Sequence, residues 1–280
     1  MVAAMAGFAL EDTALKYAAR DIPVTQVLLL FGAGGAVIFA AILRIKGHAF
    51  WSPHVTSRPM RVRVLFEISG RLFYVLALAL APLSSATAIL QAAPLVVVAG
   101  AAIFFGEQVG WRRWAAIFIG FIGVLIVLQP TSDTFTFASI FAVLGMLGFA
   151  GRDLASRAAP LALSTAHLGF YGFLSIIVAA VLFGIWDGNW WADLSLNVSL
   201  AMGVAILFGV VAYGALMRAM RTGDVATVTP FRYSRLLFGV MLGTFYFGER
   251  LSLTMSVGCA LIVLSGLYIL WRSNRDKDKT

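Results

Sequence analysis

Charged residues are scarce in this chain, and their scarcity excludes a soluble globular protein. Only 12% of the 280 residues are charged, whereas 61% are hydrophobic; soluble domains carry about 25% charged residues. The mean hydropathy is +0.92. This composition predicts a polytopic membrane protein, with the lipid bilayer as its partner. The net charge of +8 does not indicate a nucleic-acid partner, because the basic residues cluster in short gaps between apolar runs, where they orient a membrane protein.

Residues for disulfide, metal and nucleotide chemistry are also missing. The single cysteine, Cys259, excludes an internal disulfide. The three histidines, His48, His54 and His167, show none of the spacings that hold zinc. No G-x-x-x-x-G-K-S/T motif occurs, so ATP is not expected to drive the protein. We therefore expect no metal and no cofactor, and the start shows no leader or cleavage site of a removable signal peptide.

An internal repeat organises the chain. Residues 7–16 read GFALEDTALK and residues 148–157 read GFAGRDLASR, so both follow G-F-A-x-x-D-x-A-x-K/R. A second echo pairs Phe105-Gly106-Glu107 with Phe247-Gly248-Glu249. The first echo is displaced by 141 residues and the second by 142. Two unrelated motifs with nearly one offset indicate two tandem copies of one unit. We place these copies at residues 1–130 and 131–280.

Ten apolar segments are long enough, or nearly so, to cross about 30 Å of hydrocarbon, which takes about 20 helical residues. Helices are required there because lipid offers no partner for backbone N–H and C=O groups. The expected spans are 2–19, 24–45, 62–81, 84–105, 112–129, 135–158, 165–186, 197–220, 225–247 and 252–272. The sequence therefore predicts an all-α membrane protein with ten transmembrane helices, five in each copy.

The distribution of Lys and Arg predicts the orientation. Each gap between spans is numbered by the span before it. Fifteen of these residues fall in or beside the even-numbered gaps and in the C-terminal tail, whereas the odd-numbered gaps hold only Arg20 and Arg250, with Lys16 near the first. Because positive charge marks the cytoplasmic side, both termini are expected in the cytoplasm. Five helices per copy is an odd number, so the second copy must be inverted relative to the first, as in many secondary transporters.

Several charged residues lie inside the expected spans, where a charge costs about 2.5–3.5 kcal/mol on insertion scales. Three pairs stand four residues apart, on one face of a helix, where they are able to pair. They are Asp12 with Lys16, Glu67 with Arg71, and Asp153 with Arg157. The first and third pairs lie near helix ends and serve either as structural ion pairs or as gates. The deeper Glu67–Arg71 pair is open to a structural or a functional role.

Two arginines, Arg232 and Arg235, stand one turn apart in the ninth expected span. That span holds no acidic residue, so their partners must come from other helices. Glu67 and Asp153 are the candidate partners. Burying two neighbouring arginines in a membrane costs more free energy than helix packing alone requires, which favours a functional role.

Uncharged polar residues complete a candidate central cavity between the third, fourth, eighth and ninth spans. A cavity for an amphipathic solute needs apolar walls and a few polar groups. The candidate lining residues are Glu67, Arg71, Tyr74, Gln91, Tyr213, Arg232, Tyr233 and Arg235. Such a lining fits a zwitterion: Arg235 would bind its carboxylate through paired hydrogen bonds, and a carboxylate or Gln91 would meet its ammonium group. Each aromatic residue, taken alone, favours a lipid-facing or core position over a place in the cavity.

The motif residues resemble the EamA family of the drug/metabolite transporter superfamily. The resemblance rests on Pro94, Phe105-Gly106-Glu107, Trp111, Gly120 and Gly123 in the first copy, and on Pro230, Phe247-Gly248-Glu249, Gly258 and Gly266 in the second. It covers nearly the whole chain and implies ten helices, inverted repeats and cytoplasmic termini in a bacterial inner membrane. The overall pattern is most similar to the YddG-type exporters of amino acids, although Gly7-Phe8 stands where many relatives carry a tryptophan.

The expected function is the export of aromatic and other neutral amino acids by alternating access, through a monomer or a homodimer. An alternative in the same superfamily is the export of another small metabolite or drug, such as a nucleoside or a cationic compound. A receptor, a channel or an assembly subunit fits the composition too, and saturable counterflow in liposomes separates a carrier from these. An enzyme is not expected, because Glu67 near Gln91 does not make a coherent catalytic set.

Overall fold

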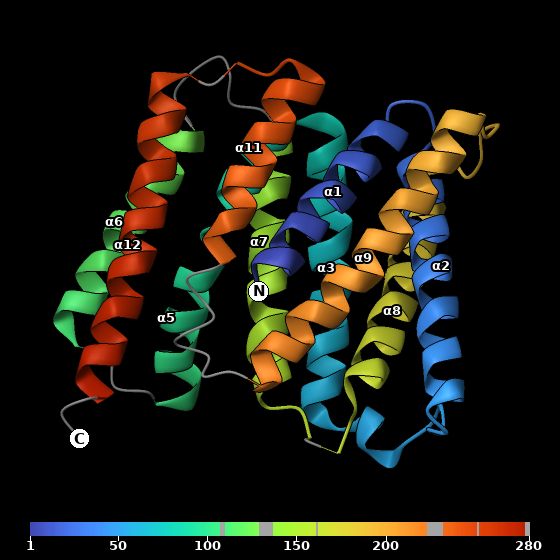
Figure 1. The fold of residues 1–280 in the computed structure, drawn as a ribbon, viewed down its shortest axis with the longest axis horizontal. Helices are drawn as coiled ribbons and strands as arrows, with labels where there is room; N and C mark the ends of the chain where they lie inside the picture. Colours follow the sequence, from blue (N-terminus) through green and yellow to red (C-terminus); the bar gives the residue numbers. More distant parts are fainter. Residues whose placement is uncertain (107–109, 129–136, 161, 223–231, 251, 278–280) are drawn as a thin grey trace.

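The computed structural model describes residues 1–106, 110–128, 137–160, 162–222, 232–250 and 252–277, which form an all-helical bundle (Figure 1). No strand occurs within these ranges. The helices are α1 (Val2–Ala18), α2 (Val24–Ile45), the short 3-10 helix η1 (Pro53–Thr56), α3 (Arg58–Leu80), α4 (Leu83–Leu90), α5 (Ala93–Phe105), α6 (Trp111–Leu128), α7 (Phe137–Arg157), α8 (Thr165–Asp187), α9 (Leu196–Thr222), α11 (Ser234–Phe247) and α12 (Leu253–Lys277).

The helices coincide closely with the expected spans. α2 begins and ends at the predicted residues. α3 begins earlier than predicted, at Arg58, because Pro59 suits the first turn of a helix, where an N–H has no intrahelical partner. The fourth span is broken at Gln91 and Ala92 into α4 and α5. Of the ninth span, α11 is described, and residues 225–231 lie outside the described ranges.

Five helices in the described ranges are long and apolar enough to cross a membrane. They are Val24–Ile45, Leu83–Phe104, Ala138–Ser156, Thr165–Asp187 and Leu196–Leu216, and shorter apolar helices cover Trp114–Val127, Ser234–Phe247 and Leu253–Tyr268. The two remaining helices, α1 and α3, carry most of the buried charge. The helices thus agree with a multi-pass membrane protein, and the count of ten transmembrane helices stays a prediction.

Helices in the two halves of the chain correspond at the offset of the sequence motifs. α2 and α8 begin 141 residues apart, and α6 and α12 begin 142 apart. α5 and α11 both end at a glycine with a φ of 67°, Gly106 and Gly248. This left-handed conformation suits glycine because it has no Cβ. The repeated Phe-Gly sequence therefore marks the same helix end in each half.

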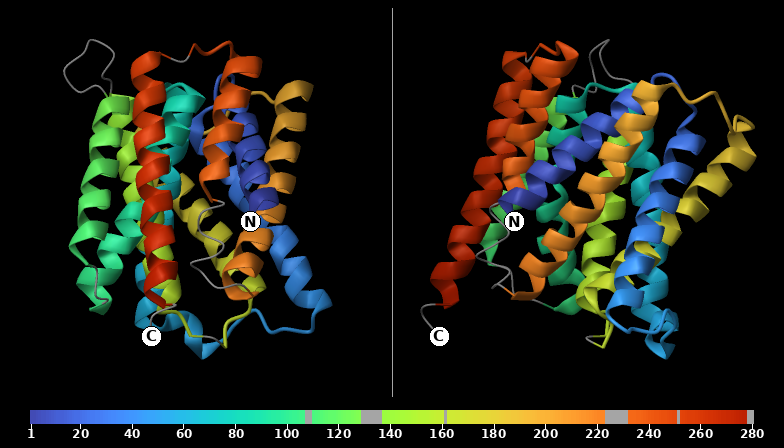
Figure 2. Two further views of the ribbon diagram at one scale, coloured as in Figure 1. Left: turned by 60° about the vertical axis from the view of Figure 1, so that its left-hand side comes forward. Right: turned by 45° about the vertical axis from the view of Figure 1, so that its right-hand side comes forward.

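The corresponding helices also pack in corresponding ways (Figures 1 and 2). The most extensive pairings are α3 with α7, α1 with α9, α2 with α8 and α6 with α12. The counterparts are α1 and α7, α2 and α8, α3 and α9, and α6 and α12. The α3–α7 pairing therefore corresponds to the α9–α1 pairing, and the α2–α8 and α6–α12 pairings each join a helix to its own counterpart. The α1–α2 connection lies at the upper end of Figure 1 and the α7–α8 connection at the lower end. Counterpart helices therefore run in opposite directions.

Glycines let α3 and α7 approach closely. A Cβ on Gly148 would lie 2.3 Å from the Cα of Gly70, and one on Gly145 would lie 2.9 Å from the Cβ of Tyr74. Small residues are the usual means of close packing in lipid, where no hydrophobic effect draws helices together. This approach brings the charged side chains of α3 within reach of those on α7.

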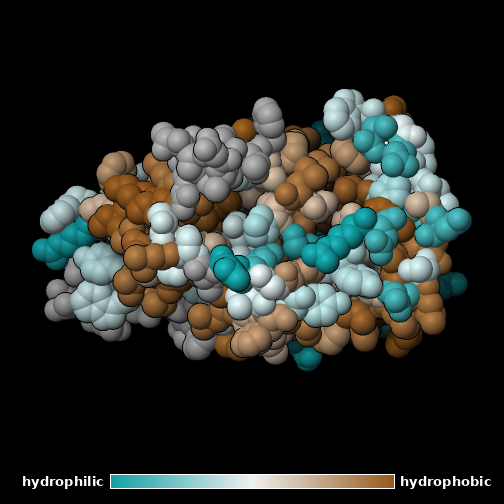
Figure 3. Space-filling model, turned by 90° about the horizontal axis from the view of Figure 1, so that it is seen from above, coloured by the Kyte–Doolittle hydropathy of each residue, from teal (hydrophilic) through white to brown (hydrophobic). Residues whose placement is uncertain are grey.

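The surface of the bundle has apolar and polar regions. Large apolar side chains stand exposed on the outer helices, among them Phe104, Phe118, Trp186 and Phe245. Figure 3 looks down on the upper end of Figure 1 and shows hydrophilic residues across the middle of this face, with hydrophobic residues along its lower edge. The marked N-terminus lies part way along the bundle, and the last turns of α12 lie at the lower end (Figure 1).

Candidate functional site

A pocket lies inside the bundle where both halves of the chain meet. Its cavity volume is about 40 Å³, and its walls come from α1, α3, the α4–α5 break, α7, α9 and the start of α11. The lining residues are Met5, Phe8, Arg71, Leu90, Gln91, Ala93, Pro94, Phe149, Arg152, Leu216, Arg232 and Arg235. The walls are apolar apart from four arginines and one glutamine, a mixture typical of sites for small molecules.

Two helix ends meet at this pocket. α5 begins at Ala93, directly after the break at Gln91, and α11 begins at Ser234. The side-chain amide of Gln91 donates to the carbonyl oxygen of Arg232 at 3.0 Å and so ties the two ends together. Irregular backbone at membrane depth is tolerated where it is buried in protein or lines a cavity. Broken helices of this kind form the substrate sites of many transporters.

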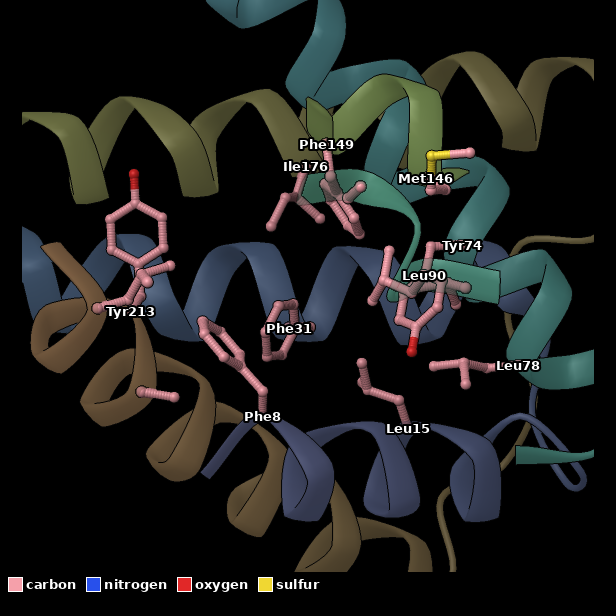
Figure 4. Close-up of a cluster of buried hydrophobic side chains, with 14 of the residues drawn as sticks. Phe8, Leu15, Phe31, Tyr74, Leu78, Leu90, Met146, Phe149, Ile176 and Tyr213 are labelled. Atoms are coloured by element: carbon pink, nitrogen blue, oxygen red, sulfur yellow. The ribbon is translucent and has the colours of Figure 1, made fainter. Parts of the chain in front are cut away.

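Aromatic rings hold the pocket arginines in place. Phe8 on α1 and Phe149 on α7 point into the space between their helices (Figure 4). The guanidinium of Arg235 lies 4.9 Å from the ring centre of Phe8, and that of Arg152 lies 4.8 Å from Phe149. Arg71 also faces Phe149, at 5.6 Å. Guanidinium groups stack on aromatic faces in this way, which fixes their planes against the wall.

On the α1 side of the pocket, two carboxylates bind two of these arginines. The Asp12 Oδ2 atom accepts from Arg235 at 2.6 Å and from the hydroxyl of Tyr74 at 3.0 Å. Glu11 Oε1 accepts from Arg71 at 2.5 Å. All of these groups are buried or nearly so. Buried charges require such partners, since an unpaired charge away from water is strongly disfavoured.

On the α7 side, the charged side chains form a continuous series of ion pairs. Arg232 donates to Asp153 at 2.9 Å, and Asp153 also accepts from Arg152 at 2.9 Å. Arg152 in turn binds Glu67 at 3.3 Å, and Glu67 binds Arg63 at 3.3 Å. This series of ion pairs runs from the start of α11 through α7 to the first turns of α3.

Arg63 anchors the far end of this series of ion pairs. Its guanidinium donates to the hydroxyl of Tyr213, to Ser156 Oγ at 3.1 Å and to the carbonyl oxygen of Leu168 at 3.3 Å. The Tyr213 hydroxyl donates to the same carbonyl at 3.2 Å. Arg63 therefore links α3 to α7, α8 and α9 at the end of the bundle that holds the α2–α3 connection.

Two further charged side chains, Lys16 and Glu249, bind the backbone at the opposite end of the bundle, near the α3–α4 connection. The Lys16 ammonium donates to the carbonyl oxygens of Leu78, at 3.1 Å, and Ala81, where α3 ends and leaves carbonyls without intrahelical partners. Glu249 accepts from the backbone N–H groups of Leu83 at 2.6 Å and Ser84 at 2.9 Å, at the start of α4. A cation at a helix C-terminus and an anion at an N-terminus both complement the helix dipole.

The structure brings together only some of the expected site residues. Arg71, Gln91, Arg232 and Arg235 line the pocket. Glu67, Tyr74 and Tyr213 lie behind the wall, where they bind other side chains. Tyr233 packs against Gly266 instead, so closely that a Cβ there would meet its hydroxyl.

The expected ion pairs within single helices are corrected by the structure. Asp12 binds Arg235 instead of Lys16, and Lys16 turns to the end of α3. Glu67 binds Arg63 and Arg152 instead of Arg71. Asp12 thus pairs with another helix, whereas Glu67 pairs with Arg63 one turn before it on α3 and with Arg152 on α7. Asp153 does bind Arg232, as expected of one of the two candidate partners. The side chain of Arg157 lies outside the described part of the structure.

Three charged residues of the site were missed from the sequence. Glu11 and Arg152 occupy the same variable position of the repeated G-F-A-x-x-D motif. Arg63 is one of the fifteen basic residues that were counted only toward the orientation. A charge next to the repeated aspartate in both copies was the signal that would have found the first two.

The repeated motif has one structural meaning in both halves. Its glycine stands at a close helix crossing, where Gly7 faces Ala212 and Gly148 faces Gly70. Its phenylalanine, Phe8 or Phe149, lines the pocket. Its aspartates, Asp12 and Asp153, bind Arg235 and Arg232 at the start of α11. The motif found by repetition alone therefore builds both sides of one site.

A pocket with buried charges beside a broken helix, within an apolar bundle, is typical of membrane transport proteins. A family model described as EamA-like transporter family matches residues 1–129 and 136–271. The chain therefore belongs to the EamA-like transporter family, within the drug/metabolite transporter superfamily.

Named relatives agree with this class. An S-adenosylmethionine uptake transporter of Rickettsia bellii is 27% identical over 80% of this chain and 77% of its own length. A riboflavin transporter of Vibrio cholerae is 27% identical over 99% and 94%, and one of Rhizobium johnstonii is 28% identical over 88% and 81%. A solved crystal structure superposes with a TM-score of 0.65 over 96% of each chain at 20% identity, which shows a shared fold. These relatives do not support the finer expectation of a YddG-type exporter.

Proposed function

We propose that the protein is a secondary transporter that carries a small metabolite through the central pocket by alternating access. The observation that carries this proposal is the pocket itself, whose walls come from both halves of the chain and from the break between α4 and α5. Substrate sites of secondary transporters lie at such an interface between repeats. In this proposal residues 1–130 and 131–280 are inverted repeats that rock about the pocket.

Two sets of contacts between the halves would act as gates. Toward the α3–α4 connection, Asp12 of the first half binds Arg235 of the second, and Glu249 binds the start of α4. Toward the α2–α3 connection, Glu67 binds Arg152, and Arg63 binds Tyr213. Alternating access requires one set to open while the other stays closed, so these contacts would break and form in turn.

The substrate we propose is a metabolite with a flat heteroaromatic ring. Both compounds in the names of the relatives, S-adenosylmethionine and riboflavin, contain such a ring. The pocket offers the rings of Phe8 and Phe149, guanidinium planes and the apolar Met5, Leu90 and Leu216. Flat aromatic and guanidinium groups stack readily on a flat ring.

Export of amino acids is the second candidate, and the pocket supports it less well. An arginine would bind the carboxylate of an amino acid. The ammonium group would find no Asp or Glu among the described lining residues, and only the amide oxygen of Gln91 would be available to it. A free zwitterion therefore has a partner for one of its two charges.

Counterflow in proteoliposomes tests the proposed function. Liposomes with purified protein, preloaded with unlabelled riboflavin, should accumulate labelled riboflavin in a saturable way. The double variant Phe8→Ala/Phe149→Ala should abolish accumulation, whereas Phe104→Ala, on the exposed outer face, should not. Counterflow of labelled phenylalanine or methionine without that of riboflavin would favour the amino-acid exporter. Linear, unsaturable flux of every compound would indicate a channel.

A further inference from the structure

The four arginines in the wall of the pocket bear on the charge of its ligand. Arg71, Arg152, Arg232 and Arg235 all line the cavity, and none of the twelve lining residues is Asp or Glu. The carboxylates that bind these arginines stand behind them, on α1, α3 and α7. A molecule inside the pocket therefore meets cationic groups without meeting the anionic ones.

The buried cluster around the pocket also carries an excess of positive charge. Among the side chains described there, five arginines face four carboxylates. The arginines are Arg63, Arg71, Arg152, Arg232 and Arg235, and the carboxylates are Glu11, Asp12, Glu67 and Asp153. An uncompensated charge at membrane depth is costly, and a bound anion would remove that cost.

One of the pocket arginines has an unused donor. The Nε atom of Arg71 is buried and has no hydrogen-bond partner, although its neighbouring nitrogen binds Glu11. Buried guanidinium donors in proteins are almost always satisfied. A donor left open on a side chain that lines a cavity is a place for a ligand oxygen.

The apolar part of the pocket wall suits a flat ring of the ligand. Met5, Leu90, Pro94 and Leu216 form the apolar part of the lining. The stacking of Arg235 on Phe8 and of Arg152 on Phe149 fixes the guanidinium planes. Arginine binds carboxylate and phosphate through planar, paired donors. The pocket thus joins an apolar region to a cationic one.

We propose that the ligand of this pocket is an organic anion, a flat heteroaromatic ring that carries a phosphate or a carboxylate. This inference rests on the proposed function, because it concerns the substrate of the same site. A cationic ligand would be repelled by the four arginines, and a neutral ring would leave the buried excess of positive charge uncompensated.

Matched ligand pairs test this inference by equilibrium binding to the purified full-length protein. Riboflavin and flavin mononucleotide share a ring and differ by a phosphate; nicotinamide and nicotinate differ by a carboxylate. At least one anionic member should bind about tenfold more tightly than its neutral partner, a difference of about 1.4 kcal/mol. A preference in the flavin pair identifies phosphate as the recognised group, and one in the nicotinate pair identifies carboxylate.

Variants locate the effect in the pocket. The double substitution Glu11→Gln/Arg71→Gln removes one guanidinium together with its carboxylate, so no buried charge is left alone. It should reduce the preference for the anion over riboflavin at least threefold. Arg44→Gln removes an exposed positive charge at the end of α2 and should not change the preference. A preference lost equally in both would mean a general charge effect, which would overturn the inference.

Other results would also overturn it. Equal binding within both pairs, or tighter binding of the neutral members, would refute an anion site, and so would failure of both anions to bind. Inorganic phosphate that competes as well as flavin mononucleotide would refute the requirement for a ring. Saturable counterflow of riboflavin alongside any of these results would leave the proposed function intact.

Discussion

The α3–α7 and α1–α9 interfaces pack alike and differ in their chemistry. At the offset of 141–142 residues, the contact between Gly70 and Gly148 corresponds to the contact between Ala212 and Gly7. The charged contact of Glu67 with Arg152 in the first interface corresponds to Gly209 beside Glu11 in the second. One interface thus carries an ion pair where the other has a glycine.

The two interfaces share their small residues and differ in their charged residues. Small residues persist at both crossings, because a larger side chain would separate the helices. The charges differ: Glu11 binds Arg71 within its own half, while Arg152 binds Glu67 across the halves. The contacts that would serve as gates at the two ends are therefore chemically distinct.

Breaking the ion pair in the α3–α7 interface should have the largest effect. Glu67→Gln leaves both Arg63 and Arg152 without a shared carboxylate, and loss of one partner of a buried pair costs about 3–5 kcal/mol. Glu11→Gln deprives only Arg71 of its partner and should lower the melting temperature in detergent by less. Equal melting temperatures for the two variants would show that the series of ion pairs on α3 and α7 adds no stability.

Overpacking the two crossings should have the next largest effect. Gly148→Ala places a Cβ 2.3 Å from the Cα of Gly70, and the backbone must move to admit it. Such overpacking costs about 1–3 kcal/mol. Gly7→Ala meets only the Cβ of Ala212 at 3.0 Å and should be tolerated better. The two melting temperatures in detergent give the comparison, and a greater loss from Gly7→Ala would contradict it.

The repeated aspartates should differ in their effect on transport. Asp12 binds an arginine of the other half, whereas Asp153 binds Arg232 within its own half. A contact between halves must break and form in each cycle, so we expect Asp12→Asn to lower the counterflow rate about tenfold, or about 1.4 kcal/mol. Asp153→Asn should lower it less, in liposomes matched for folded protein. A larger loss from Asp153→Asn would count against rocking of the two halves.

The smallest perturbation tests the inverted arrangement. His48 and Asn189 are 141 residues apart, each directly follows a glycine of positive φ, and both are exposed. Single cysteines at these positions, in a Cys259→Ser background, should leave the fold and transport unchanged. An impermeant maleimide should label His48→Cys only from the cytoplasm and Asn189→Cys only from outside. Labelling of both from one side would refute inverted repeats.

The fold followed from local properties of the sequence. Each apolar run predicts a helix because lipid leaves backbone groups no partner outside the segment, and α2 duly begins and ends where expected. The family assignment likewise needed only short motifs with their spacing. The break between α4 and α5 was missed, since Leu83–Phe104 has a mean hydropathy of 2.0 and hydropathy does not reveal where a helix is interrupted.

The site was predicted only in part, because sequence spacing favours neighbours on one helix. In place of the expected Asp12–Lys16 and Glu67–Arg71 pairs, Asp12 binds Arg235 on another helix, and Glu67 binds Arg63 on its own helix and Arg152 on another. Asp12 and Arg235 are 223 residues apart, and Glu67 and Arg152 are 85 apart. Their meeting depends on the rotation of each helix about its axis and on crossings set by single glycines.

The sequence by itself determined the apolar helices, their repetition at one offset and the residues of the G-F-A-x-x-D motif. These are local features, since a helix in lipid satisfies its own hydrogen bonds within the segment. Only the tertiary structure decided that Arg71, Arg152, Arg232 and Arg235 turn toward one cavity while their carboxylates stand behind them. Side chains one residue apart on a helix point about 100° apart, so the packing of the helices selects which of them face the pocket.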